Sequence, residues 1–267
     1  MLKQRTIVTV IGIPLTIALI WLGSPWFTLF AVVWGVFSAY EFYRVVRYSQ
    51  GIVPLSYFGM VWVALVIVSP QISQTLPLPV ILTGAVVLPL LFLLWRKDKP
   101  RAFLSWAWTI GGILYIGWLL SYLVGLRNLN DGRDWVFLSM LSTFGSDVFA
   151  FIFGRAFGKH KLAPYISPKK TWEGAAAGVV GSILVSLVVV YISHLPVSYL
   201  GAVLFGILIS FAGQLGDLVK SLFKRNMTVK DSSNLIPGHG GFLDRMDSQA
   251  FAGVAVYYCV VYLVGKF

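Results

Sequence analysis

Charged residues are scarce in this chain of 267 residues. Asp, Glu, Lys and Arg together make up 12% of it, against roughly 25% in an ordinary soluble domain. Hydrophobic residues make up 58%. This balance excludes a soluble globular protein, and it predicts an all-α fold in the form of a polytopic bundle of transmembrane helices.

Cysteine and histidine, the usual ligands of zinc, are also scarce. The single cysteine, Cys259, lies in an apolar run, and one thiol cannot form an internal disulfide. The three histidines, His160, His194 and His239, form no His-x-x-His pair. A zinc site is therefore not expected. Six of the ten acidic residues follow Trp135, so the chemistry is expected in the C-terminal half.

Apolar segments long enough to cross a bilayer recur along the chain. The first lasts to about Leu22, longer than the core of a typical signal peptide, and no A-x-A site follows it, so it is interpreted as a first transmembrane helix. We divide one integrated bundle into N-terminal helices, residues 1–134, and C-terminal helices, residues 135–267, which carry the site. The nine predicted spans are residues 6–23, 26–43, 53–70, 78–95, 104–126, 135–155, 174–193, 197–218 and 248–265.

The loops between these spans alternate between basic and uncharged. Eighteen of the 21 Lys and Arg residues fall on one side of the membrane under this assignment. The other side holds Arg127, Arg133 and Lys266. The positive-inside rule then places the N-terminus and the basic loops in the cytoplasm and the C-terminus outside. Attraction to anionic lipid headgroups is a sufficient explanation for the early basic loops.

The eighth predicted span carries a polar stripe. Intramembrane Asp is costly, so a stripe that contains one indicates a functional site by default, with an inter-helix hydrogen bond or ion pair as the structural alternative. The spacing of 4, 3, 4 and 3 residues puts the members on one helix face. They are Ser210, Gln214, Asp217, Ser221 and Lys224.

A strongly basic loop follows the sixth predicted span, which itself contains Asp147. Pro164 and Pro168 are expected to stiffen this loop. So many cations in one short segment suit a polyphosphate ligand, although membrane topology alone remains an alternative. The cations are Arg155, Lys159, Lys161, Lys169 and Lys170.

A glycine-rich turn precedes the ninth predicted span. Gly240 and Gly241 are expected to expose backbone N–H groups, which can cradle phosphate oxygens. Asp244 and Asp247 lie three residues apart at the predicted start of the next helix. One of them could cap that helix. Two carboxylates on one face also suit a hard cation such as Mg²⁺.

The segment from Ser221 to Asp247, SLFKRNMTVKDSSNLIPGHGGFLDRMD, resembles the signature of the phosphatidate cytidylyltransferases, also called CDP-diacylglycerol synthases. Every fixed position of that signature has a counterpart here. The segments SDVFAFIFGRAFGKHK and ISPKKTWEG resemble another cytoplasmic segment of the family, so the match extends from about Ser146 to Asp247. The resemblance implies the reaction of CTP with phosphatidate to give CDP-diacylglycerol and pyrophosphate.

Metal ligands are predicted among the carboxylates. Asp217 and Asp244 are the first candidates, followed by Asp247 and Asp147, and the three residues of the last two helices are expected to converge on one cation. Oxygen-only ligands favour Mg²⁺, and a second cation is compatible with this set.

The other predicted roles concern phosphate and nucleotide. Ser221 and His239 are expected to donate hydrogen bonds, and Gly240 and Gly241 are expected to shape the nucleotide pocket. The catalytic set is Asp217, Asp244, Asp247, Lys224 and Arg225. The residues expected to hold phosphates are Lys169, Lys170, Lys224, Arg225, Lys230 and Arg245.

The expected partners are CTP, phosphatidate and the surrounding membrane lipid, with no nucleic acid. A homodimer is compatible with so small a bundle. A membrane lipid kinase is the alternative enzyme, and nucleotide competition would separate it from a cytidylyltransferase. A transporter is a further alternative, but it would usually show midplane charges and matched broken helices in two halves.

Overall fold

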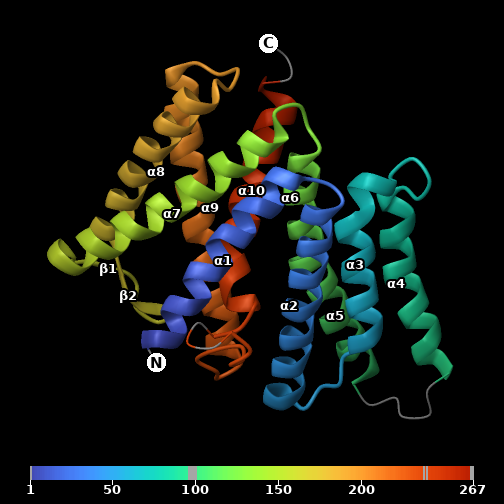
Figure 1. Cartoon of the computed structure of the whole chain (residues 1–267). Helices are drawn as coiled ribbons and strands as arrows, with labels where there is room; N and C mark the ends of the chain where they lie inside the picture. Colours follow the sequence, from blue (N-terminus) through green and yellow to red (C-terminus); the bar gives the residue numbers. More distant parts are fainter. Residues whose placement is uncertain (1, 96–100, 237, 239, 265–267) are drawn as a thin grey trace. The chain divides into compact units, whose positions relative to one another are not determined.

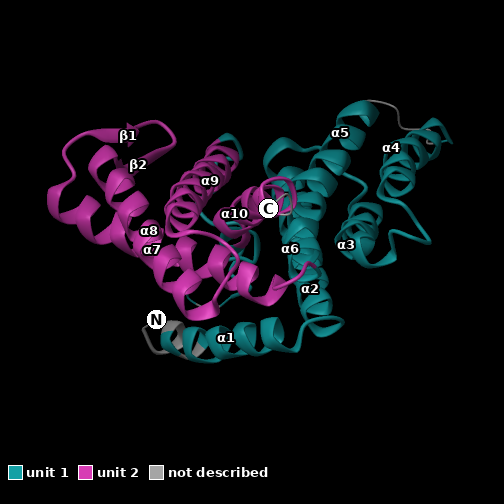
Figure 2. Ribbon diagram, turned by 90° about the horizontal axis from the view of Figure 1, so that it is seen from above, with its two compact units in different colours: residues 1–128, 226–245 teal, residues 129–225, 246–267 magenta. Residues whose placement is uncertain are grey.

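The computed structural model describes residues 2–95, 101–236, 238 and 240–264 of the chain. They form two compact units, each assembled from two stretches of sequence (Figure 2). Unit 1 contains residues 1–128 and 226–245, and unit 2 contains residues 129–225 and 246–267. The division at residue 135 expected from the sequence, with both sets of helices in one bundle, stays a prediction.

Unit 1 is built from helices and one long loop (Figure 1). A π-helical segment, Ile113–Trp118, joins α5 to α6, so residues 102–127 form one continuous helical run. The helices are α1 (Leu2–Leu22), α2 (Trp26–Gln50), α3 (Ser56–Ile72), α4 (Leu78–Trp95), α5 (Ala102–Gly112) and α6 (Leu119–Arg127).

The interior of unit 1 is organised around Tyr43 on α2. Its side chain is 1% exposed, and its hydroxyl donates a 2.8 Å hydrogen bond to the Thr109 carbonyl on α5. A Cβ atom at Gly59 of α3 would lie 2.2 Å from that hydroxyl oxygen. Glycine at this position therefore lets α3 pack closely against α2.

Unit 2 contains the remaining helices and a small hairpin. Strands β1 and β2 pair antiparallel, with Lys161 opposite Thr171. Thr171 then caps the next helix, because its hydroxyl accepts a 3.2 Å hydrogen bond from the Gly174 amide. The elements are α7 (Gly132–Phe157), β1 (Lys161–Ala163), β2 (Ser167–Thr171), α8 (Trp172–Ser193), α9 (Tyr199–Asn226) and α10 (Leu243–Tyr262), of which the last residue of α9 and the first three residues of α10 belong to unit 1.

The described chain is predominantly helical and has the helices of a polytopic membrane protein, as predicted. Six helical runs are long and apolar enough to cross a bilayer, and α1 and α3 contain shorter apolar stretches. Each predicted span overlaps a helix, but the number nine stays a prediction. The hairpin was not predicted. It lies within the basic segment that was expected to be a loop stiffened by proline.

Candidate functional site

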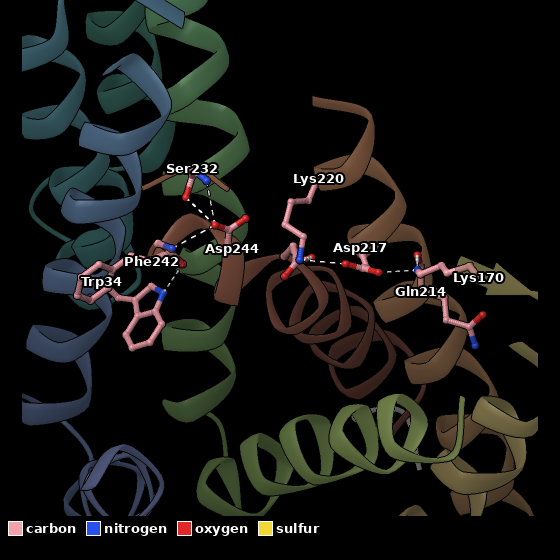
Figure 3. Close-up of polar contacts among 10 residues, drawn as sticks. Trp34, Lys170, Gln214, Asp217, Lys220, Ser232, Phe242 and Asp244 are labelled. Carbon is pink, nitrogen blue, oxygen red and sulfur yellow. Dashed lines mark hydrogen bonds and ion pairs between the residues drawn. The ribbon is translucent and has the colours of Figure 1, made fainter. Parts of the chain in front are cut away.

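Four charged side chains meet in unit 2, and we call them the lysine–aspartate cluster. Figure 3 shows Lys170, Asp217 and Lys220 of this cluster. Asp217 on α9 is 2.7 Å from the Nζ of Lys170 on β2 through Oδ2, and 2.9 Å from the Nζ of Lys220 through Oδ1. The same Lys220 Nζ is 2.5 Å from Oδ2 of Asp247 on α10. The cluster therefore alternates cation and anion across three elements of unit 2.

Local structure accounts for this meeting. Asp217 and Lys220 are three residues apart on α9 and so share a helix face. A Cβ atom at Gly216 would lie 2.5 Å from the backbone oxygen of Asp247, so glycine lets the α10 backbone come close to α9. Lys170 reaches the cluster because strand β2 exposes its neighbour Lys169 and turns Lys170 inward.

The cluster is buried at one end and open at the other. The side chains of Asp247 and Lys220 are 5% and 13% exposed, whereas those of Lys170 and Asp217 are 24% and 30% exposed. Asp147 on α7 is exposed and close enough for electrostatic repulsion with Asp217 and Asp247. Three carboxylates thus accompany two ammonium groups, which leaves a formal excess of negative charge.

The first half of the polar stripe has a structural role. The hydroxyls of Ser210 on α9 and Ser146 on α7 form a 2.7 Å hydrogen bond. The Gln214 amide donates to the Ser210 hydroxyl at 2.9 Å and to the Ala175 carbonyl at 3.1 Å. The inter-helix alternative therefore holds for Ser210 and Gln214, and the ionic chemistry begins at Asp217. Further along the stripe, Ser221 and Lys224 are half-buried.

The predicted phosphate-binding cations are placed in different surroundings. Arg225, at the end of α9, donates a 3.2 Å hydrogen bond from Nε to the Ile166 carbonyl in the hairpin. Lys169, Lys230 and Arg245 have exposed side chains. The structure brings Lys170 of this set into the lysine–aspartate cluster.

The loop between α9 and α10, residues 227–242, belongs to unit 1 together with Asp244. Oδ2 of Asp244 accepts hydrogen bonds from the Ser232 amide at 3.0 Å, the Ser232 hydroxyl at 3.0 Å and the Gly241 amide at 3.1 Å. The carboxylate thus joins two parts of the loop. Both donor residues precede Asp244 in the chain, whereas the side chain of an N-cap residue accepts from backbone amides further into the helix. Its role as a metal ligand stays a prediction.

The glycine-rich turn has the left-handed glycines that its sequence predicts, but the expectation of an exposed N–H group is wrong for Gly241, which is buried and donates its amide to Asp244 Oδ2. Gly238 and Gly240 have φ values of 78° and 82°, in the left-handed region that glycine enters without steric cost. Ile236 and Gly240 form an isolated antiparallel bridge across the turn. The predicted hydrogen-bond donor His239 lies outside the described residues.

Two residues that make close polar contacts in the structure are not among the site residues predicted from the sequence. Lys220 is one of the 18 cations explained by membrane topology, although its position three residues after Asp217 places it beside the stripe. Glu41 lies within an apolar span, where an acidic residue is itself a signal of function. It is 0% exposed in the structure, and its partners come from the loop before α10 and from the first residue of that helix.

Together these features define a helical membrane protein with ionic chemistry in its C-terminal half. The chain belongs to the Cytidylyltransferase family, whose model matches residues 3–263. It is 34% identical to phosphatidate cytidylyltransferase 5, chloroplastic, of Arabidopsis thaliana over 92% of this chain and 69% of that protein. It is also 34% identical to the phosphatidate cytidylyltransferase of Synechocystis sp., over 98% and 97% of the two chains. The enzyme of that name from Staphylococcus haemolyticus is 31% identical, over 94% and 95%.

Proposed function

We propose that this protein is a phosphatidate cytidylyltransferase, which converts CTP and phosphatidate into CDP-diacylglycerol and pyrophosphate. The observation that carries the proposal is family membership across nearly the whole chain, with relatives of that name alignable from end to end. The signature from Ser221 to Asp247 supports the same conclusion independently. A lipid kinase and a transporter are not favoured, because neither accounts for this signature.

The chemistry is a transfer between two phosphate groups. A phosphate oxygen of phosphatidate forms a bond to the α-phosphorus of CTP, and the bond from that phosphorus to the β-phosphate oxygen breaks. Pyrophosphate leaves with the electron pair. The nucleophile is anionic near neutral pH, so a strong general base is not required. The main obstacle is bringing two polyanions together, which positioned cations can overcome.

The residues divide into groups that suit this obstacle. In the lysine–aspartate cluster, Asp217 holds Lys170 and Lys220 in fixed positions. The cations predicted to bind the phosphates of the two substrates have exposed or half-buried side chains. We assign this role to Lys169, Lys170, Lys224, Arg225, Lys230 and Arg245, with Ser221 and His239 as donors and Gly240 and Gly241 as the nucleotide turn.

Magnesium fits the donor chemistry of the cluster. Asp147, Asp217 and Asp247 offer carboxylate oxygens with a formal excess of negative charge, which suits a hard cation. Both oxygens of Asp217 already contact ammonium groups, and within the described ranges no group of three or more His, Cys, Asp or Glu residues is arranged to hold a metal. To hold Mg²⁺, Asp217 and Asp247 of the predicted ligand set would exchange a lysine contact for the metal. Asp244 and Asp147 remain the other proposed ligands. When bound, it supplies charge neutralisation for the phosphates.

We further propose a cytoplasmic N-terminus, a cytoplasmic site and an external C-terminus, with nine membrane crossings. The asymmetric distribution of Lys and Arg supports this orientation. Reporter fusions at the C-terminus and within residues 167–171 should therefore report opposite sides of the membrane. Both reporters on the same side would contradict the nine-helix topology.

The direct test of the proposed activity is nucleotide choice. Purified protein supplied with phosphatidate should release pyrophosphate in step with a CDP-lipid when CTP, or dCTP, is the donor. Excess ATP should neither replace CTP nor compete with it strongly. Formation of ADP and a phosphorylated lipid from ATP would replace this proposal with the kinase alternative.

A further inference from the structure

Glu41 on α2 is a buried carboxylate surrounded by hydrogen-bond donors. Its Oε2 accepts from the Ser232 hydroxyl at 2.8 Å and the Leu243 amide at 2.9 Å. Its Oε1 accepts from the Ser233 hydroxyl at 2.5 Å and the Phe242 amide at 3.0 Å. All of these residues belong to unit 1, and the Glu41 residue is 0% exposed.

These four donors are neutral, so among the residues that the structure describes the negative charge is balanced by dipoles rather than by an ion pair. Two of the donors are the Phe242 and Leu243 amides at the start of α10, where the helix dipole favours an anion. Hydrogen bonds to a charged acceptor are roughly twice as strong as those between neutral groups. Burying a carboxylate is costly unless its oxygens are satisfied, and here each oxygen has two donors.

The donors come from both ends of the glycine-rich turn. Ser232 and Ser233 precede the turn, whereas Phe242 and Leu243 follow it, and Glu41 joins the two sides. A Cβ atom at Gly241 would lie 2.2 Å from Glu41 Oε2 and 2.2 Å from the Ser232 oxygen. The backbone at Gly241 is therefore packed tightly against this carboxylate and Ser232.

Neighbouring residues of α2 reinforce the attachment. The Trp34 indole donates a 3.2 Å hydrogen bond to the Phe242 carbonyl (Figure 3). The rings of Phe37 and Phe242 stack with their centroids 4.9 Å apart. Trp34, Phe37 and Glu41 are spaced three and four residues apart, which places them on one face of α2. This face holds the loop immediately before Asp244.

We propose that Glu41 is a positioning residue for cytidylyl transfer, which fixes the glycine-rich turn and orients the Asp244 carboxylate through their shared contact with Ser232. The Ser232 hydroxyl lies 2.8 Å from Glu41 Oε2 and 3.0 Å from Asp244 Oδ2, so it couples the two carboxylates. This inference rests on the proposed function. Its claim is that an acidic residue of α2, outside the signature, sets the geometry of the signature loop.

The test begins with Glu41→Gln. An amide group replaces one accepting oxygen by a donor, so whichever way the side chain turns, two of the four donors face an N–H₂ group. We expect kcat/KM for CTP to fall about 10- to 100-fold, the range found when a supporting contact of a binding site is lost. The loss should consist mainly of a higher KM for CTP, with KM for phosphatidate changed less than about 2-fold, because the turn is assigned to the nucleotide. Ser38→Ala is the matched control, since Ser38 is a polar residue of α2 that is also 0% exposed.

Two further measurements separate positioning from folding. Hydrogen–deuterium exchange in residues 230–243 should accelerate in folded Glu41→Gln and remain unchanged in Ser38→Ala. Ser233→Ala removes one donor and keeps Glu41, so it should raise KM for CTP in the same direction by a few fold. This milder variant provides the test if Glu41→Gln fails to fold.

The outcomes distinguish this inference from the proposed function. An inactive wild-type protein with CTP and phosphatidate would refute the function itself. An active wild type, with unchanged KM for CTP in both folded Glu41→Gln and Ser233→Ala, would overturn the positioning role. Activity that falls only in proportion to the folded fraction would also overturn it, because that result assigns Glu41 to stability alone.

Discussion

Asp217→Asn should lower kcat/KM for CTP by about 100-fold or more, the scale of removing a preorganised electrostatic group from an active site. Asp217 contacts Lys170 through one carboxylate oxygen and Lys220 through the other. Asparagine keeps the size of the side chain but offers one accepting oxygen, so one ammonium group faces an N–H₂ group. The lysines then lose the fixed positions from which they can meet phosphates. Steady-state kinetics of folded protein, with CTP and Mg²⁺ varied separately, measure the effect.

The matched control is Asp134→Asn. Asp134 forms a 2.9 Å ion pair with Arg133 near the start of α7, in the same unit. That pair is partly exposed and lies outside the cluster, so its removal should change kcat/KM by less than about 2-fold. Full activity in a well-folded Asp217→Asn protein, with unchanged Mg²⁺ dependence, would remove Asp217 from the site.

Lys220→Met should have the largest effect on stability, and it should also abolish most of the activity. Lys220 lies between Asp217 and Asp247, and the Asp247 side chain is 5% exposed. Removing the lysine leaves a buried carboxylate without its cation, which typically costs about 3–5 kcal/mol. Thermal unfolding of the detergent-solubilised protein should show a marked decrease in Tm.

A second substitution separates stability from catalysis at this position. In the double variant Lys220→Met with Asp247→Leu, no buried charge is left at the Asp247 position, and apolar replacement of a buried pair is often neutral. We expect most of the lost Tm to return while activity stays low. Recovery of activity together with Tm would show that Lys220 and Asp247 act as structural residues, and it would contradict their place in the site.

The parts of this fold that follow from composition were predictable. Apolar segments of sufficient length gave the helices, because a bilayer imposes length and hydropathy directly on the sequence. The hairpin at residues 161–171 was not predictable in the same way. Its two short strands contain three lysines and one proline among eight residues, and they form through contacts with each other rather than from a strong local preference.

The candidate site was predicted in part for a related reason. The stripe on α9 pointed to Asp217, since helical spacing is visible in sequence. The spacing of three residues between Asp244 and Asp247 predicts that both carboxylates bind the same cation. In the structure Asp247 contacts Lys220, whereas Asp244 organises the loop through Ser232 and Gly241. Which partner each carboxylate meets depends on tertiary packing and not on spacing.

The contacts of Glu41 could not be predicted from the spacing of residues in the sequence. Its partner Ser232 lies 191 residues further along the chain, so no spacing rule connects the two. The acidic residue in an apolar helix was the available signal. The structure places four hydrogen-bond donors around this residue, which its sequence context does not predict.

The measurement that tests the central claim most directly is the fate of labelled phosphate. Purified protein should be supplied with phosphatidate and with CTP carrying radioactive phosphorus at either the α or the γ position. Cytidylyl transfer predicts that the α label appears in the lipid product and that the γ label appears in pyrophosphate. Transfer of the γ label to lipid, with the α label left in CDP, would contradict the account and identify a kinase.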